Sequence, residues 1–213
     1  MEQTYTIAVI GGTGKAGQYL VKEIIKQGYK IRLLLRNPAK FPEENPLIEK
    51  VKGNARNVES IAELINGCTA VISTLGQTKG EPPAFEVVAQ NITKAMISQG
   101  IDRYISITGL TIDTPTDKKS RSTKFQTKLM KLLFPAIIRD KQKEYEIISG
   151  SPLDWTMVRL PFIELTDTIS EIKISREDCP GKKISSASLA AFLTHQITSN
   201  QFSREAIFIA NIS

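Results

Sequence analysis

Two kinds of apolar pattern alternate along the chain. Short continuous apolar runs are predicted as buried strands, and segments in which apolar residues recur every three or four positions are predicted as helices. Strands are predicted at residues 4–10, 31–35, 47–51, 69–74, 103–107, 155–159 and 206–210. Helical spacing joins Leu20, Val21, Ile24 and Ile25, then Ile61, Leu64 and Ile65, then Phe85, Val88, Ile92 and Met96, and further helices are predicted at 138–149 and 187–197.

The predicted strands and helices follow one another in turn along the chain. Gly28, Gly67 and Gly100 come just after helical positions, as helix stops do, and Asn57 is a predicted N-cap. Repeated strand–helix–strand units need crossover connections, which make a sheet mainly parallel and cover both of its faces with helices. The pattern therefore predicts an α/β fold with a doubly wound parallel sheet.

Length and composition favour one domain over residues 1–213. Hydrophobic residues make up 41% and charged residues 23%, which is ordinary for a soluble globular protein. No segment approaches the roughly 18 consecutive apolar residues of a membrane span, and residues 1–4 do not begin a secretion signal. We therefore expect a cytoplasmic protein. Cys68 and Cys179 lack metal-ligand spacing, so no metal site is expected.

A glycine-rich turn follows the first predicted strand directly and precedes the first predicted helix. Gly11, Gly14 and Gly17 are spaced three apart within GGTGKAG at residues 11–17. Glycines allow a sharp turn and close approach of the backbone to a pyrophosphate, and the helix N-terminus offers unpaired N–H groups. A triphosphate loop is disfavoured because Ala16 follows Lys15, where that motif needs Ser or Thr. The turn predicts a dinucleotide site.

The end of the second strand distinguishes NADP from NAD. NAD-binding proteins usually have an acidic residue there that accepts hydrogen bonds from the adenosine ribose. This chain has Arg36 instead, with Lys40 nearby. A guanidinium can pair with a 2′-phosphate through two hydrogen bonds. NADP(H) is therefore the predicted cofactor, with NAD(H) as the alternative.

Several motifs in this order resemble the atypical short-chain dehydrogenase/reductase superfamily. They are IAVIGGTGKAG at 7–17, LRN at 35–37, VKGN at 51–54, STLG at 73–76 and LDWTMVRLP at 153–161. The chain most resembles the NAD(P)H-binding group that contains flavin reductase/biliverdin-IXβ reductase and NmrA-like regulators of nitrogen metabolite repression. The resemblance spans nearly the whole chain and implies a Rossmann-like fold, but it does not identify the substrate.

The resemblance also implies where a bound cofactor lies. It puts the 2′-phosphate on Arg36 and the adenine beside Gly53 and Asn54, where relatives usually have Asp in place of Asn54. Leu75 and Gly76 are expected beside the adenosine ribose. The pyrophosphate is expected on Gly11, Thr13, Gly14, Lys15 and Ala16.

The nicotinamide end follows from the same resemblance. Thr108 and Gly109 are expected to face the nicotinamide, while Leu160, Pro161 and Phe162 close the far side of its ring. Lys141 falls where relatives have a lysine about ten residues before the turn at 151–154.

Catalytic residues are harder to predict, because the usual Ser-Tyr-Lys set is absent. None of the five tyrosines has a lysine four positions later, and alignment puts Ile137 at the Tyr position and Gly109 at the Ser position. Alcohol oxidation and sugar epimerisation need proton transfer from a hydroxyl and are disfavoured. Thr108 and Lys141 are the candidate catalytic residues. Alternatively, Thr108 caps its own strand and Lys141 is an exposed helix residue.

These observations predict an NADP(H)-dependent oxidoreductase that passes a hydride to a flavin such as FMN, a quinone or another small conjugated acceptor. The main alternative is a non-catalytic NADP(H)-sensing regulatory protein. A nucleotide-sugar epimerase or dehydratase is a third hypothesis, although only 54 residues follow Arg159. No nucleic-acid partner is expected, and the sequence does not indicate the oligomeric state.

The positive charge is concentrated in residues 118–143, which carry nine basic residues against one acidic residue, a net charge of +8. The rest of the chain has 19 basic and 21 acidic residues, or −2. We interpret residues near 111–140 as a lid-like insertion that packs its apolar stripe over the acceptor site. Contact of 122–134 with an anionic membrane surface is the alternative. The predicted helix has an apolar stripe of Phe125, Leu129, Leu132 and Leu133 beside Lys124, Lys128 and Lys131.

Overall fold

The computed structural model describes residues 5–212 and contains one eight-stranded sheet. Neighbouring strands pair in parallel, except that the last strand at one edge runs antiparallel to its neighbour. In spatial order the strands are β3 (Ile48–Lys52), β2 (Lys30–Leu35), β1 (Thr6–Ile10), β4 (Ala70–Ser73), β5 (Arg103–Gly109), β6 (Asp154–Leu160), β10 (Glu205–Asn211) and β8 (Ile172–Ser175).

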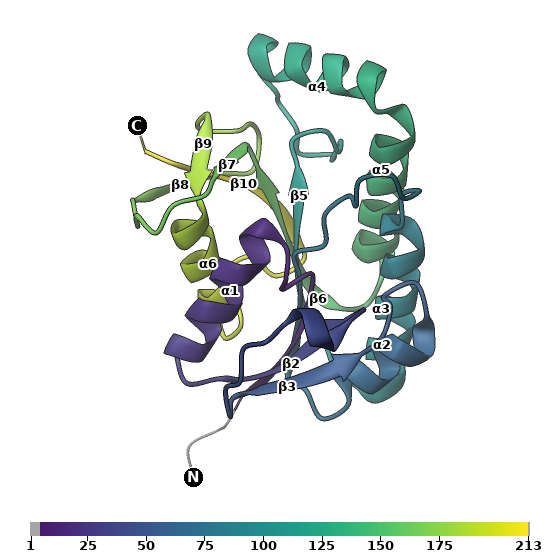
Figure 1. Ribbon diagram of the computed structural model, residues 1–213. Coiled ribbons are helices and arrows are strands. Elements are labelled where there is room, and N and C mark those ends of the chain that lie inside the picture. Colours follow the sequence, from purple (N-terminus) through teal and green to yellow (C-terminus); the bar gives the residue numbers. More distant parts are fainter. Residues whose placement is uncertain (1–4, 213) are drawn as a thin grey trace.

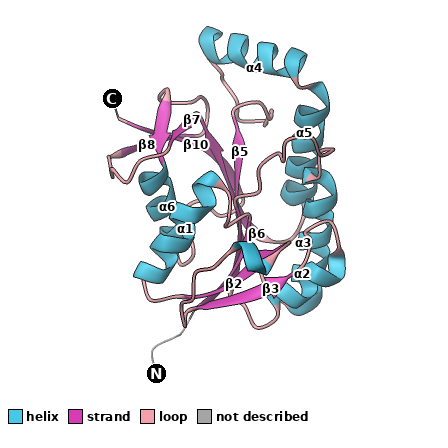
Figure 2. Ribbon diagram, viewed as in Figure 1, coloured by secondary structure: helices cyan, strands magenta, loops and turns pink. Residues whose placement is uncertain are grey.

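Helices cover both faces of this sheet (Figures 1 and 2). On one face lie α1 (Lys15–Lys26) and α6 (Ser186–His195), and on the other lie α2 (Val58–Ile65), α3 (Phe85–Gln99) and α5 (Pro135–Gly150). Each helix buries an apolar stripe, such as Leu20 and Ile24 of α1 or Val88 and Ile92 of α3. The predicted doubly wound, Rossmann-like fold is confirmed.

Most predicted elements are present, with shifts of a few residues at their ends. The start of the first predicted strand at Thr4 lies outside the described residues. Asn57 caps α2 as predicted, since its side chain accepts a hydrogen bond from the Ser60 amide at 2.8 Å. Sequence patterns missed three short strands after β6: β8, and the parallel pair of β7 (Phe162–Glu164) and β9 (Lys183–Ser185).

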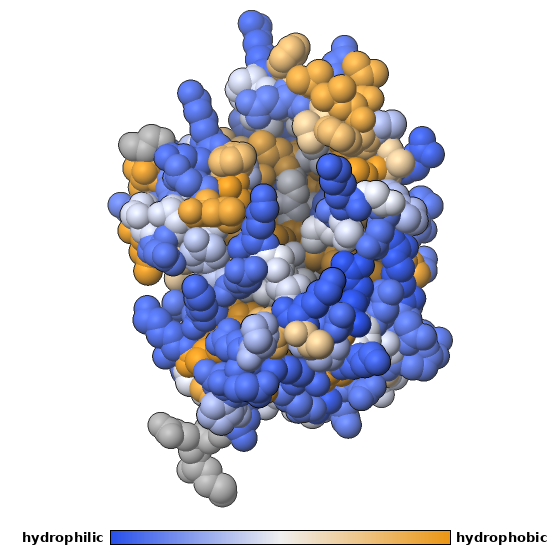
Figure 3. All heavy atoms as spheres, viewed as in Figure 1, coloured by the Kyte–Doolittle hydropathy of each residue, from blue (hydrophilic) through white to orange (hydrophobic). Residues whose placement is uncertain are grey.

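One helix, α4 (Arg121–Leu133), stands apart from both layers, beyond the end of β5 (Figure 1). This helix was predicted, but the prediction that its apolar stripe packs over the acceptor site is wrong. Its buried residues are Thr123 and Thr127, whereas Phe125 and Leu132 are 70% and 76% exposed. Figure 3 shows apolar side chains gathered at this end of the molecule. The outward face of α4 is therefore apolar.

Candidate functional site

The turn between β1 and α1 is held tightly by its own backbone. Gly11 has a φ of +80°, and its carbonyl accepts a hydrogen bond from the Gly14 amide at 2.9 Å. A Cβ at Gly17 would lie 2.2 Å from the Gly11 carbonyl oxygen. Since no side chain fits between α1 and the turn, the glycines bring the helix directly against the end of β1.

The N-terminus of α1 opens into a cavity of about 580 Å³ between the ends of β1 and β4. No side chain caps this end of α1, and its first turn contains no acidic residue. Its N–H groups and the positive end of the helix dipole therefore favour an anion. Gly11, Thr13, Gly14 and Lys15 line this cavity, while Ala16 is not among the lining residues. The cradle fits the pyrophosphate of a dinucleotide.

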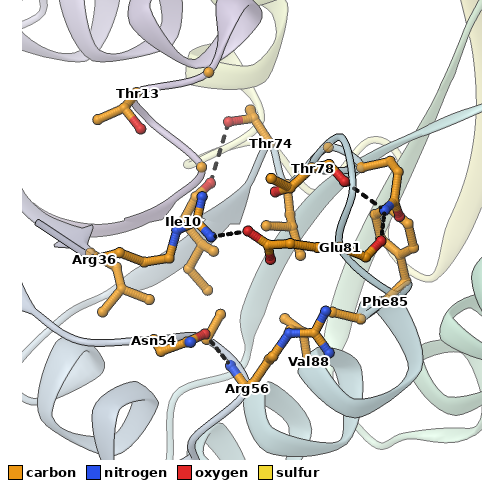
Figure 4. A pocket seen from close by; sticks show the side chains of 18 of the residues that line it. Ile10, Thr13, Arg36, Asn54, Arg56, Thr74, Thr78, Glu81, Phe85 and Val88 are labelled. Carbon is orange, nitrogen blue, oxygen red and sulfur yellow. Dashed lines mark hydrogen bonds and ion pairs between the residues drawn. The ribbon is translucent and has the colours of Figure 1, made fainter.

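We call this cavity, which the N-terminus of α1 faces, the cofactor cavity. Its opposite wall comes from β2, β3 and the residues that follow them (Figure 4). Arg36, Gly53 and Asn54 line it, and Lys40 is not among the lining residues. The Asn54 side chain accepts a hydrogen bond from the Arg56 amide at 3.0 Å, which holds the turn before α2. A Cβ at Gly53 would meet the Ser60 side chain at 2.7 Å.

A loop over residues 74–84 forms the rim of the cofactor cavity. Leu75 and Gly76 lie on this loop and line the cavity. Arg36 extends toward this loop, and its Nη1 pairs with Oε1 of Glu81 at 2.6 Å (Figure 4). Arg56 donates hydrogen bonds to the carbonyl oxygens of Pro82 and Pro83. The cation predicted for the 2′-phosphate therefore has a carboxylate partner, which the sequence did not indicate.

A second cavity, of about 1010 Å³, lies beyond the ends of β5 and β6. Gln77 lines both cavities, so the two adjoin at this side chain. We call the second one the acceptor cavity. Its lining is mostly apolar and comes from α4, α5, the strand ends and the loop before β9. It includes Gly109, Met130, Phe134, Ile137, Leu160, Pro161 and Phe162.

Lys141 lies where the two cavities approach each other. It lines the acceptor cavity, and its Nζ is 3.8 Å from the centre of the Phe85 ring, which lines the cofactor cavity. The same Nζ lies 3.7 Å from Oε2 of Glu144. Burial raises the pKa of Glu144, and the positive charge of Lys141 only partly opposes this. The interpretation of Lys141 as a freely exposed helix residue is wrong, since its side chain is only 15% exposed.

The other candidate catalytic residue, Thr108, is buried in β5. Its hydroxyl has no hydrogen-bond partner among the described residues, and Thr108 is not among the residues that line the acceptor cavity. The neighbouring Gly109 does line it, as does Ile137, four residues before Lys141 on α5. Gly109 and Ile137 stand where the typical catalytic set has Ser and Tyr, so these two positions carry no hydroxyl group here.

A buried ion-pair network supports the loop that carries α4. Arg159 of β6 is 0% exposed, and its Nη2 lies 2.9 Å from Oδ2 of Asp117. Lys119 pairs with Asp117 at 3.0 Å and with Asp113 at 2.9 Å. Burial by itself would raise the pKa of Asp117, but hydrogen bonds from Arg159 and Thr114 outweigh it and lower the pKa to about 2. Sequence reasoning missed this network, because its buried cation, Arg159, is 42 positions away from Asp117 in the chain.

Comparison with known families agrees with this geometry. A family model described as NAD(P)H-binding matches residues 11–200, from the glycine turn to the turn between α6 and β10. The chain belongs to this family. An NAD(P)H-binding protein needs a cradle for the pyrophosphate, which the uncapped end of α1 and the glycine turn provide.

Curated relatives match over part of the chain. An isoflavone reductase homolog (A622-like) from Nicotiana tabacum is 36% identical over 109 residues, which cover 46% of this chain and 33% of the relative. Photosystem II assembly factor Ycf39 from Trieres chinensis is 37% identical over 73 residues, 32% of this chain and 22% of that protein. The match spans about a third or less of each relative's length, so it carries no whole-protein activity to this family member.

Solved structures match over nearly the whole chain at low identity. A Rossmann-fold NAD(P)-binding family protein from Shigella flexneri is 20% identical, with a TM-score of 0.76 over 98% of this chain and 94% of its own. A short-chain dehydrogenase/reductase from Veillonella parvula in complex with NADP is 13% identical, with a TM-score of 0.80 over 98% and 95% of the two chains. These likenesses show the fold.

Proposed function

We propose that this NAD(P)H-binding family member is an NADP(H)-dependent oxidoreductase that passes a hydride to a flavin, a quinone or another conjugated acceptor. The observation that carries the proposal is the adjoining pair of cavities, which share Gln77. One has a cradle for a pyrophosphate, and the other is large and mostly apolar, as a flat conjugated acceptor requires. The reduced nicotinamide, when bound, supplies the hydride.

The chain's own residues would bind and orient the two reactants. The N–H groups at the start of α1 hold the pyrophosphate, and Arg36 holds the 2′-phosphate. Pro161 and Phe162, which directly follow β6, line the acceptor cavity, and the nicotinamide ring would lie against them. The apolar part of the lining, which includes Ile137 and Leu160, would pack against a flat acceptor.

The shortage of proton donors favours acceptors whose reduction needs little acid catalysis by the protein. Ile137 and Gly109 supply no acidic hydroxyl in the acceptor cavity, and the Thr108 hydroxyl is buried outside its lining. Reduction of a flavin or quinone can take its proton from solvent, unlike alcohol oxidation. In this proposal Lys141 positions an acceptor or the nicotinamide ribose through its charge, without serving as an essential acid.

Steady-state oxidation of NADPH with FMN, quinones and a linear tetrapyrrole tests the proposal. We expect turnover with at least one acceptor. Lys141→Ala should raise the KM for that acceptor by about tenfold, equivalent to ~1.4 kcal/mol, while turnover stays measurable. Lys94→Ala, at an exposed position on α3, is the control. Complete loss of turnover in Lys141→Ala, with NADPH binding intact, would instead make Lys141 an essential acid.

A second function, NADP(H) sensing without catalysis, is supported by the same missing hydroxyls at positions 109 and 137. In that case wild type would bind NADPH with its preference over NADH intact and would oxidise it with none of the acceptors. Binding without oxidation across the panel is the outcome that favours the sensor over the reductase.

A further inference from the structure

The apolar and polar faces of α4 are reversed relative to the other helices. In an ordinary surface helix the apolar stripe faces the protein and the polar side chains face water. In α4 the polar Thr123 and Thr127 are buried, and Thr123, Gln126, Thr127 and Met130 line the acceptor cavity. The outward stripe consists of Phe125, Leu129, Leu132 and Leu133, all exposed. A contiguous apolar surface of this kind marks an interaction site.

The contacts at both ends of α4 fix this orientation. At its start, the Ser120 amide donates a hydrogen bond to Oδ2 of Asp178 at 3.0 Å, and the Ser120 hydroxyl caps the helix. Near its end, Lys131 pairs with Asp113, which also pairs with the buried Lys119. Rolling the helix to bury Phe125 and its neighbours would break these contacts. The outward orientation of the apolar stripe is therefore fixed by the fold.

The charge beside the stripe indicates what covers it. Lys124 and Lys128 lie next to the apolar stripe, and Arg121 precedes them on the same helix. Within residues 5–212, none of these three cations forms an ion pair, whereas Lys131 and Lys119 do. Residues 118–143 together carry a net charge of +8. A second copy of the chain would bring two such segments together, and their repulsion opposes a symmetric dimer through this face.

We propose that α4 docks the protein on an anionic membrane surface. An apolar stripe flanked by lysines enters the boundary between lipid headgroups and acyl chains, and the unpaired cations attract anionic lipid. No helix in the described part of the chain is long and apolar enough to cross a membrane. The proposed contact is therefore peripheral, with the acceptor cavity opening beside the docked helix. It stands independently of the reductase proposal.

Co-sedimentation of the full chain with vesicles tests this proposal. One set of vesicles contains phosphatidylcholine alone, and the other adds phosphatidylglycerol. We expect binding to the anionic vesicles at low salt that weakens at high salt. Two double variants separate the contributions: Phe125→Ser with Leu132→Ser removes apolar surface, and Lys124→Glu with Lys128→Glu reverses charge. Each should weaken binding about tenfold or more.

Matched controls lie on α3, where Ile97 and Lys94 are exposed. Ile97→Ser with Lys94→Glu should bind vesicles as wild type does. NADPH titration of every variant reports whether its fold is intact. The proposal is overturned if wild type does not bind anionic vesicles at low salt, or if the serine variant, still binding NADPH, binds them as tightly as wild type. Concentration-dependent dimerisation that needs Phe125 and Leu132, without vesicle binding, would assign the stripe to a second copy instead.

Discussion

The cofactor cavity and the acceptor cavity are built in opposite ways. One wall of the cofactor cavity is a single short segment, residues 10–17, in which backbone atoms make the close contacts. The acceptor cavity is assembled from side chains of α4, α5, two strand ends and a loop near residue 180. Its supporting loop depends on a buried ion pair between residues 42 positions apart, Asp117 and Arg159. The α1 wall of the cofactor cavity is therefore fixed locally, whereas the acceptor cavity is fixed by tertiary contacts.

This difference teaches where each region is vulnerable. Substitutions in the cofactor cavity should act through backbone geometry and change cofactor binding. Substitutions beneath the acceptor cavity should act through buried charge and change stability, while the cradle at α1 keeps its shape.

Removing the Asp117 carboxylate beneath the acceptor cavity should reduce stability the most. Asp117→Ala leaves the fully buried Arg159 guanidinium without its ion-pair partner. We expect the free energy of unfolding to fall by about 3–5 kcal/mol, measured by urea denaturation. Asp167→Ala is the control, because Asp167 is exposed, and should stay within about 0.5 kcal/mol of wild type. A loss below about 1 kcal/mol for Asp117→Ala would contradict the buried-network account.

Adding a side chain to the glycine turn should have the second-largest effect. A Cβ at Gly17 would lie 2.2 Å from the Gly11 carbonyl oxygen and 2.7 Å from the Gly12 Cα, so α1 would have to move away from β1. Gly17→Ala should cost about 1–3 kcal/mol of stability and weaken NADPH binding severely in a titration. Gly150→Ala, where a Cβ meets nothing within 4 Å, should leave NADPH affinity unchanged. Wild-type affinity in Gly17→Ala would show that the cradle is not the binding site.

A smaller effect is expected at the rim of the cofactor cavity. Wild type should bind NADPH about tenfold more tightly than NADH, or ~1.4 kcal/mol, and Arg36→Ala should abolish the preference. Glu81 competes for the same guanidinium, so Glu81→Gln should tighten NADPH binding about two- to fivefold without changing NADH binding. Lys40→Ala should keep the preference. If Arg36→Ala retains it as well, another group recognises the 2′-phosphate.

Mild acid should have the smallest effect on the acceptor side. Because the pKa of Asp117 is lowered to about 2 from 3.8, its ionised form stabilises the fold above pH ~3.8. That stabilisation is lost as the pH falls through about 2. The stability difference between wild type and Asp117→Asn should therefore be constant from pH 7 to about 4 and shrink toward pH 2. A difference that stays constant down to pH 2 would mean that the Asp117 pKa is not depressed.

The same contrast explains what the sequence could predict. The parallel sheet and the turn at residues 11–17 follow from patterns that span a few residues, and both were predicted. Arg36 was placed in the cofactor cavity, but its pairing with Glu81 depends on the path of the 74–84 loop, which no local pattern specifies. The short strands β7, β8 and β9 lack a strong period of their own and form because neighbouring strands pair with them.

The α4 helix shows the limit of periodicity most plainly. Its apolar stripe was recognised from spacing, and from spacing alone an apolar stripe is expected to face the protein. The side that faces inward is instead determined by Ser120, Lys131 and their acidic partners, which lie far away in the sequence or on the preceding loop. Which residues share a face could be predicted, but which face is buried could not.

The most direct test of the proposed function is a single-turnover reaction. Protein saturated with NADPH is mixed with the acceptor that performs best in the panel, and the loss of the reduced-nicotinamide absorbance is followed in time. The account predicts oxidation of the bound cofactor within one turnover, and slower oxidation when the transferred hydrogen at C4 of the nicotinamide is deuterium. Reduced cofactor that stays bound and unoxidised in the presence of every acceptor would contradict it.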